Sequence, residues 1–203
     1  MSAGPTARLF VAVDPPTAVR EQLAAWARSA AATLTGHRGR GAASPLRVLE
    51  PPALHLTLCF LGARPVGEIG VIGAALSASA AELGELSVGA PLWLPPRRPR
   101  ALAVEIHDSG VGLARLHRGV SDAIARATSW EAERRRFRAH VTVARMRGGA
   151  TSRRGSAPTW PALPATPPAI FTPSSVVLYR SWLSPAGASY EAIATSGLAP
   201  PDR

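Results

Sequence analysis

Two short segments of the sequence carry the side chains best suited to chemistry, and both follow the pattern His-x-Thr-x. They are His55-Leu56-Thr57-Leu58 and His140-Val141-Thr142-Val143. Histidine exchanges a proton near neutral pH, so one imidazole can take a proton from an attacking oxygen while a second protonates the leaving oxygen. Threonine hydroxyls can donate hydrogen bonds to non-bridging phosphate oxygens. The two segments together favour in-line displacement at a phosphodiester.

The first segment lies in a stretch, 54–61, that has the composition of a strand and is followed by Gly62, which we expect to end it. Side chains alternate between the two faces of a strand. Three residues should therefore point to a polar face: His55, Thr57 and Cys59. Three others should point to the core: Leu56, Leu58 and Phe60.

The second segment lies in a predicted strand over 139–144. The same alternation puts His140 and Thr142 on one face, opposite Val141 and Val143. If the two strands lie side by side, the two histidines and two threonines form one cluster. Arg145 is the obvious candidate for a guanidinium that stabilises a charged phosphate transition state. Strict alternation would turn it away from the cluster unless the strand bulges or ends first.

Two alternatives apply to these histidines. A histidine in a strand is more often a hydrogen-bonded structural residue, but two motifs in phase with apolar faces favour a functional pair. A metal site would need further ligands, and neither motif supplies a carboxylate or a cysteine, since Glu50 and Glu105 lie on other segments. We therefore expect no metal and no cofactor.

The elements that must position the motifs alternate between strands and helices, which predicts an α+β fold with antiparallel sheets. Strands are predicted over 8–13, 46–49, 54–61, 86–93, 101–106 and 139–144, followed by a hairpin of 175–184 and 189–195 that turns at Pro185-Ala186-Gly187. Helices are predicted over 16–35, 65–84 and 110–128. No boundary divides the 203 residues, so residues 1–203 are expected to form one domain. The segment 146–168 is rich in proline, glycine and arginine and predicts a flexible loop.

Composition limits the class of protein. All 23 basic residues are arginines, and the net charge of +10 favours an anionic partner, although GC-rich codon usage would also give an arginine-only chain. The single cysteine, Cys59, excludes an internal disulfide and a cysteine-based zinc cluster. With no apolar run of membrane-spanning length and no signal-peptide pattern, we expect a cytoplasmic monomer that does not contact a membrane.

Four segments of the chain, taken in order, resemble the 2H phosphoesterase superfamily, and within it the LigT-type RNA 2′,3′-cyclic phosphodiesterases, also called the 2′-5′ RNA ligase family. They are residues 8–13, residues 55–62, residues 137–145, and residues 178–181 with 187–190. The resemblance spans nearly the whole chain. One departure is Ala139, where the family usually has proline before its second motif.

The resemblance implies a bilobal fold with two antiparallel sheets, outer helices and a central cleft lined by the histidines. It implies metal-independent hydrolysis of RNA 2′,3′-cyclic phosphate ends to 2′-phosphates, and in some members 2′-5′ RNA ligase activity. By the same resemblance His55 is the proton donor to the leaving 3′ oxygen and His140 the proton acceptor from water. Thr57, Thr142 and Arg145 would bind the phosphate.

Other functions fit the same residues. A related enzyme could act on other small cyclic phosphates or on 2′-5′ linked oligonucleotides. A non-catalytic RNA-binding module could use the arginines, including the run 134–136 and Arg138, and keep the cleft only as a phosphate pocket. Binding alone needs cations rather than two titrating imidazoles, which favours the enzyme.

Overall fold

The computed structural model describes residues 4–37, 43–79, 82–147, 161–184 and 187–199. Its strands are β1 (Thr6–Val13), β2 (Leu46–Val48), β3 (Leu56–Pro65), β4 (Leu86–Leu94), β5 (Ala101–Asp108), β6 (His140–Met146), β7 (Ile170–Phe171), β8 (Ser175–Ser184) and β9 (Gly187–Gly197). Its helices are α1 (Thr17–Gly36), α2 (Ile69–Ala78) and α3 (Gly112–Ala127), with short 3-10 turns η1 (Pro51–Ala53) and η2 (Val66–Glu68).

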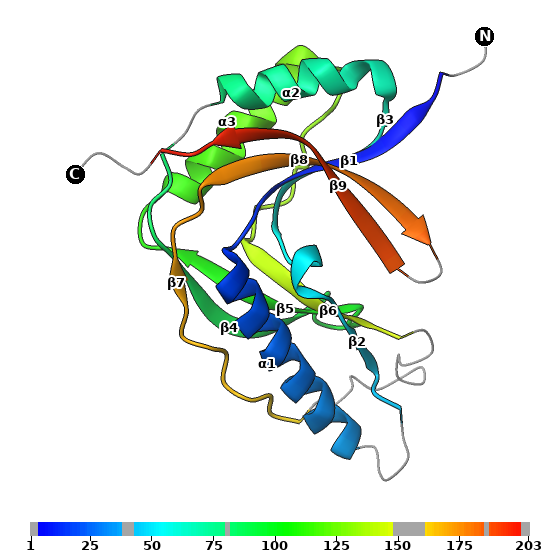
Figure 1. Ribbon diagram of the computed structural model, residues 1–203, viewed down its shortest axis with the longest axis vertical. Helices are drawn as coiled ribbons and strands as arrows, with labels where there is room; N and C mark the ends of the chain where they lie inside the picture. Colours follow the sequence, from blue (N-terminus) through cyan, green and yellow to red (C-terminus); the bar gives the residue numbers. More distant parts are fainter. Residues whose placement is uncertain (1–3, 38–42, 80–81, 148–160, 185–186, 200–203) are drawn as a thin grey trace.

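The strands form one curled antiparallel sheet with the order β7-β4-β5-β6-β3-β1-β8-β9, and β2 pairs with β6 beside β3 (Figure 1). A single residue pair, Leu56 and Val141, joins β3 to β6. The sheet therefore has two halves, which we call the β1 half (β3, β1, β8, β9) and the β5 half (β7, β4, β5, β6, β2). The α+β prediction is confirmed, and the two expected antiparallel sheets are these two halves.

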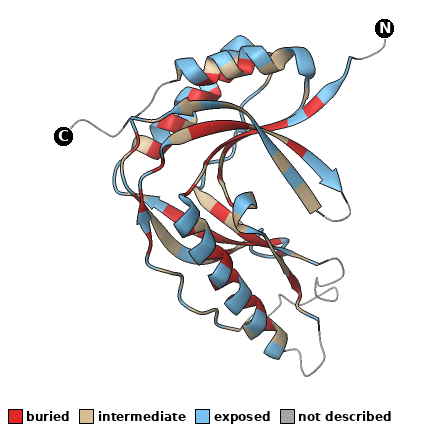
Figure 2. Cartoon of the chain, viewed as in Figure 1, coloured by how far each residue is buried: buried red, intermediate tan, exposed pale blue. Residues whose placement is uncertain are grey.

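The helices bury their apolar sides against the sheet. Helix α1 packs on β2 and β6, whereas α2 packs on β9 and α3 on β3 and α2. Along α1, residues Leu23, Ala27, Ala30 and Leu34 are buried at helical spacing, and Figure 2 shows buried and exposed positions alternating along this helix. Helix α3 does the same through Leu113, Leu116, Val120 and Ile124. Because the helices hold the sheet from outside, they fix the strands that carry the two motifs.

Most predicted elements are confirmed, with shifted ends, but the helix over 65–84 is wrong in its first turn. Strand β3 continues to Pro65, which pairs with Thr6, and the Val66 amide then donates to the Pro5 carbonyl at 3.0 Å. Helix α2 begins only at Ile69 and ends at Ala78, so residues 82–84, which the prediction included, also lie outside it. Hydrogen bonding to β1 and the residue before it therefore holds Pro65 and Val66 outside the helix to which the apolar spacing alone assigned them. The two-residue strand β7 has no sequence signal strong enough to predict it.

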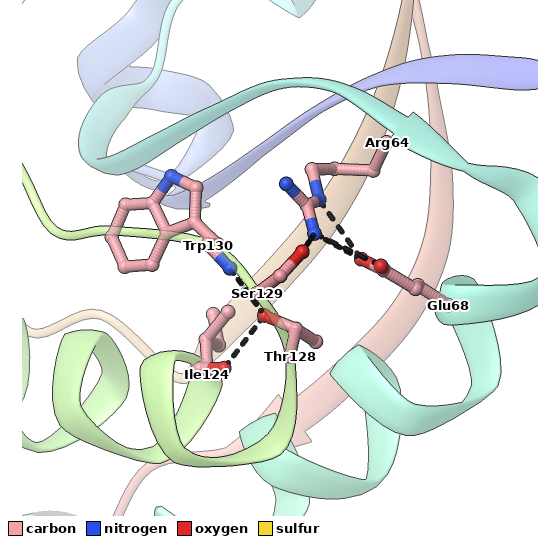
Figure 3. Close-up of polar contacts among 6 residues, drawn as sticks. All are labelled: Arg64, Glu68, Ile124, Thr128, Ser129 and Trp130. Carbon is pink, nitrogen blue, oxygen red and sulfur yellow. Dashed lines mark hydrogen bonds and ion pairs between the residues drawn. The ribbon is translucent and has the colours of Figure 1, made fainter.

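Polar contacts around Arg64 also fix this corner, as Figure 3 shows. The Arg64 guanidinium binds the Glu68 carboxylate from Nε at 2.8 Å and donates from Nη2 to Ser129 Oγ at 2.9 Å. The end of β3 is thereby tied both to η2 and to the segment after α3. Thr128 Oγ1 in turn accepts the amide of Trp130 and donates to the Ile124 carbonyl.

Two sequence predictions fall partly outside the described residues. In the loop predicted over 146–168, Met146 ends β6 and residues 161–168 form no helix or strand, but residues 148–160 are not described. The predicted hairpin turn at Pro185-Ala186-Gly187 includes Pro185 and Ala186, which are also outside the described part. Within the described residues, no helix is long and apolar enough to cross a membrane.

Candidate active site

The two His-x-Thr segments meet at the junction between the halves of the sheet. Leu56 and Val141 are antiparallel partners and are fully buried. Continuing this register by one residue in each direction sets Thr57 beside His140 and His55 beside Thr142. These four residues lie on the side of the strands opposite the two buried partners. We call this side the histidine face. The cluster expected from the sequence is thus brought together by one pair of core residues.

His55 lies immediately before β3, after the turn η1, and is surrounded by aromatic rings. Its imidazole stacks on Phe10 with ring centroids 4.7 Å apart and meets Tyr190 edge-on at 5.1 Å. Tyr179 lies beside both rings, with its ring centroid 5.1 Å from that of Phe10 and 6.2 Å from that of His55. A hydrogen bond to the backbone of Ala53 holds the imidazole from the η1 side. His55 is therefore held rigidly in an apolar wall.

This environment makes His55 a weak base. The pKa of His55 is lowered to about 4, chiefly by burial of the ring, with smaller contributions from the charge of Arg145 and from His140. The hydrogen bond to Ala53 acts in the opposite direction but is outweighed. His55 is consequently neutral at pH 7 in the free protein.

His140 is the first residue of β6 and is fixed from its other side. Its Nδ1 lies 2.7 Å from the Arg138 carbonyl oxygen, so in the neutral ring Nδ1 carries the proton and donates it. The remaining nitrogen, Nε2, is then the one able to accept a proton. Across the sheet His140 pairs with Glu105, whose carboxylate is bound by the Arg138 guanidinium. Arg138 thus contacts His140 through its backbone and Glu105 through its side chain.

A bulge in β6 returns Arg145 to the histidine face. Along β5, Ala103 pairs with Thr142 while the preceding Leu102 pairs with Ala144, so Val143 is an extra residue in β6. Val143 and Ala144 are accordingly both buried. After the bulge, Ala101 pairs with Arg145 on the same side as the pair formed by Ala103 and Thr142. The five-residue spacing between His140 and Arg145, which alternation alone would place on opposite faces, therefore leaves both on one face.

A second bulge corrects the faces predicted for Cys59 and Phe60. In β3, Thr57 pairs with Ala12 and Cys59 with the next residue back, Val11, so Leu58 is an extra residue. Alternation reverses after it. Cys59 lies in the core, with its sulfur 3.1 Å from Ser121 Oγ of α3, and burial raises its pKa to about 11. Phe60, expected in the core, is instead 48% exposed.

The same strand contains another bulge at Leu61, next to Gly62, which has a φ of 71°. Glycine adopts this backbone conformation without the steric penalty of other residues. The prediction that Gly62 ends the strand is therefore wrong: the glycine allows the strand to bulge and continue. Phe60 lies between the two bulges on the histidine face, and the Arg8 guanidinium lies over its ring at 4.5 Å.

The rings of Phe10, Tyr179 and Tyr190 form an aromatic wall around His55. Sequence patterns alone gave these residues no role, although they belong to segments that carry the family resemblance. Phe10 occupies the polar-face position of β1, between the buried Leu9 and Val11. An aromatic residue at that position was the one sequence feature that could have predicted a role beside His55. The Tyr179 hydroxyl donates to Asp14 Oδ2 at 2.6 Å, which fixes its ring, and burial together with this hydrogen bond raises the pKa of the tyrosine. Their contact with His55 depends on strand order, which alternation does not show.

A hollow of about 470 Å³ lies next to the cluster, on the β5 half. It is lined by Glu105, Ile106, His107 and residues 136–139. It contains none of the four clustered residues but borders His140 through Ala139. Within the described residues, no group of three or more His, Cys, Asp or Glu side chains is arranged to hold a metal ion. The chemistry that this site can support is proton transfer by two imidazoles beside a guanidinium.

Comparison with known proteins identifies the fold. No protein-family model and no curated protein matches the chain. Among solved structures, TT0787 of Thermus thermophilus is 25% identical, with a TM-score of 0.69 over 95% of this chain and 98% of that chain. LigT of E. coli complexed with 3′-AMP is 21% identical, with a TM-score of 0.70 over 96% and 99%. A protein described as a phosphoesterase is 22% identical, with a TM-score of 0.72 over 96% and 99%.

These matches cover nearly all of both chains in each pair. The protein therefore has the fold of the LigT-like phosphoesterases. The resemblance to the 2H phosphoesterase superfamily read from the sequence is confirmed at the level of the fold.

Proposed function

We propose that this protein is a phosphoesterase of the 2H type that hydrolyses 2′,3′-cyclic phosphate ends of RNA to 2′-phosphates. The observation that carries the proposal is the pairing of Leu56 with Val141, which sets both His-x-Thr motifs side by side on one face. The fold shared with LigT-like phosphoesterases supports the reaction class. The net charge of +10 supports an anionic substrate such as RNA.

The reaction divides between the two histidines. His140 Nε2 takes a proton from water as the water oxygen forms a bond to phosphorus. The bond from phosphorus to the 3′ oxygen breaks, and His55 gives its proton to that oxygen, leaving a 2′-phosphate. Thr57 and Thr142 donate hydrogen bonds to the non-bridging oxygens, and Arg145 offsets the negative charge that grows on them. No metal is needed, because both proton transfers and the charge stabilisation come from side chains.

The low pKa of His55 bears on its role as the proton donor. Its ring must be protonated to act as a donor, yet it is neutral in the free protein at pH 7. A bound phosphate brings a negative charge next to the ring, which favours the protonated form and raises the pKa. Substrate binding thus favours the protonated form of His55, which is the form that can donate a proton. The aromatic wall then keeps water away from the proton until the 3′ oxygen accepts it.

The test is hydrolysis of a nucleoside 2′,3′-cyclic phosphate and of an oligonucleotide with a cyclic phosphate end, both in excess chelator. Products are resolved as 2′- or 3′-phosphates. The variants are His55→Gln and His140→Gln, which keep polar side chains of similar size but cannot shuttle the proton. His37→Ala, at an exposed histidine after α1, is the matched control. Circular dichroism shows whether each variant is folded.

We expect chelator-resistant formation of a 2′-phosphate, with each glutamine variant slower by about 10²- to 10⁴-fold and the control unchanged. Formation of a 3′-phosphate would contradict the assigned leaving group. Turnover indifferent to either histidine would refute the two-histidine mechanism. RNA binding without turnover on any 2′,3′-cyclic, other cyclic or 2′-5′ linked substrate would favour a binding module instead.

A further inference from the structure

We propose that Arg47, together with Arg145, binds a second phosphate of the substrate, the one that links the terminal nucleotide to the rest of the RNA chain. This inference rests on the proposed function and extends it to substrate selection. It makes Arg47 the residue that distinguishes an RNA end from a free nucleoside 2′,3′-cyclic phosphate.

The first observation is the position of Arg47 in the sheet. Arg47 of β2 is the direct antiparallel partner of Arg145 of β6, so both residues belong to the same side of the sheet, the histidine face. Directly opposed side chains have Cβ atoms about 5 Å apart, and like charges placed in this way repel. The described ion pairs of the chain do not include Arg145. An anion between the two guanidinium groups would offset the repulsion.

The second observation is that the Arg47 guanidinium reaches the other half of the sheet. A Cβ added to Gly187, the first residue of β9, would lie 2.2 Å from Arg47 Nη1. Only a residue without a side chain allows this approach, and Gly187 also has a φ of 139°, which other residues rarely adopt. Arg47 therefore extends from the β5 half to the end of the β8–β9 hairpin.

The same hairpin relates Arg47 to the catalytic cluster. Tyr190, three residues after Gly187 on β9, meets His55 edge-on at 5.1 Å. Three residues of a strand span about 10 Å, so Gly187, which the Arg47 guanidinium approaches, lies about 10 Å along β9 from Tyr190. Arg145 is the strand partner of Arg47 and lies on the same face as His140 and Thr142.

This arrangement suits two phosphates in succession. The scissile phosphate occupies the histidine cluster, and Arg145 is within reach of its charge. The next phosphate along the chain would lie farther out, towards Arg47. A guanidinium has five N–H donors, so Arg47 can bind a phosphate and keep its packing against the hairpin. A nucleoside 2′,3′-cyclic phosphate has no such second group.

The experiment compares two dinucleotides that both end in a 2′,3′-cyclic phosphate. One has a normal internal phosphodiester, and the other has an uncharged methylphosphonate at the same link. The value of kcat/KM is measured for both with the native protein, Arg47→Ala, Arg47→Lys and Arg28→Ala. Arg28 is exposed on α1, so its replacement removes the same charge from outside the site.

We expect the native protein to prefer the phosphodiester by about 10- to 100-fold, the range for a hydrogen bond to a charged group. Arg47→Ala should reduce this ratio to near one, and Arg47→Lys should give an intermediate ratio because lysine cannot bind in a bidentate manner. Arg28→Ala should keep the native ratio. An Arg47→Ala protein that retains the native ratio would overturn the inference while leaving the proposed function intact.

A binding measurement separates the two proposals if no substrate is turned over. Fluorescence anisotropy gives Kd for the same two dinucleotides without any reaction. Loss of the phosphodiester preference in Arg47→Ala would then support the second phosphate site, although the proposed hydrolysis would have failed. Equal Kd values for both dinucleotides in the native protein would refute the site itself.

Discussion

The pKa of His55 is the property of this site that most directly tests the structure, and Tyr190→Ala is the change that should move it. In the native protein, burial lowers this pKa from 6.5 to about 4. At pH 7 about one molecule in a thousand would then carry a charged His55, compared with about one in four for an ordinary histidine. Tyr190 covers one side of the imidazole at 5.1 Å. Its removal lets water reach the ring and stabilise the charged form.

We expect the pKa of His55 to rise by roughly one unit in Tyr190→Ala, because Phe10 and the Ala53 contact still cover the rest of the ring. Tyr190→Phe keeps the ring and should leave the value near about 4. The assay is NMR titration of the imidazole signals between about pH 3 and pH 8, with His55→Gln to assign the resonance. The limb of the kcat/KM profile that His55 controls should move in the same direction, since that profile reports the free enzyme.

A native His55 that titrates near 6.5 would refute the reasoning, because the ring could not then be buried as described. An unchanged value in Tyr190→Ala would show that this side of the ring does not exclude water. An equal rise in Tyr190→Phe would assign the effect to the tyrosine hydroxyl rather than to the ring.

Three further predictions follow from the described contacts. Because the folded-state pKa of His55 lies below its unfolded value, the unfolded chain binds the proton more readily, and stability should fall as the pH is lowered from about 6.5 to about 4. The slope from this one group is at most about 1.4 kcal/mol per pH unit, and urea unfolding should show it reduced in His55→Gln. Cys59 lies in the core with its pKa raised to about 11, so its thiol should resist alkylation at pH 8 in the native protein and react quickly in urea. Fast alkylation of the native protein would contradict the placement of Cys59 on the core side of β3. Gly187→Ala should lower the Tm, because the added Cβ would clash with Arg47 and a φ of 139° is strained for alanine. Gly67→Ala is the control and should leave the Tm unchanged, because its Cβ would meet no atom within 4 Å. Equal melting of both variants would show that the Arg47 contact is absent.

Local patterns in the sequence determined the larger elements of this protein. The helix over 16–35 follows from apolar residues at helical spacing, and α1 runs over Thr17–Gly36. The final hairpin follows from two alternating segments around a turn, and β8 and β9 pair along their length. These features depend on residues close together in the chain. They are visible in the sequence because period and turn chemistry act locally.

The sequence also identified His55 and His140 as partners, because their motifs repeat a chemically unusual pattern in phase with apolar residues. It assigned Thr57 and Thr142 to the same face on the same basis. The structure places these residues together through the register of Leu56 and Val141. Their catalytic roles stay predictions until the variants are measured.

Only the tertiary structure decided the faces of residues beyond the bulges. Leu58 and Val143 are each an extra residue relative to a partner strand, and such a shift is a property of two strands rather than of one. For that reason strict alternation placed Cys59 and Phe60 on the wrong faces and left Arg145 uncertain. The ring contacts of His55 and the approach of Arg47 to Gly187 likewise join segments far apart in the chain. The sequence alone determined which groups could do the chemistry, whereas long-range strand pairing decided which of them share a face.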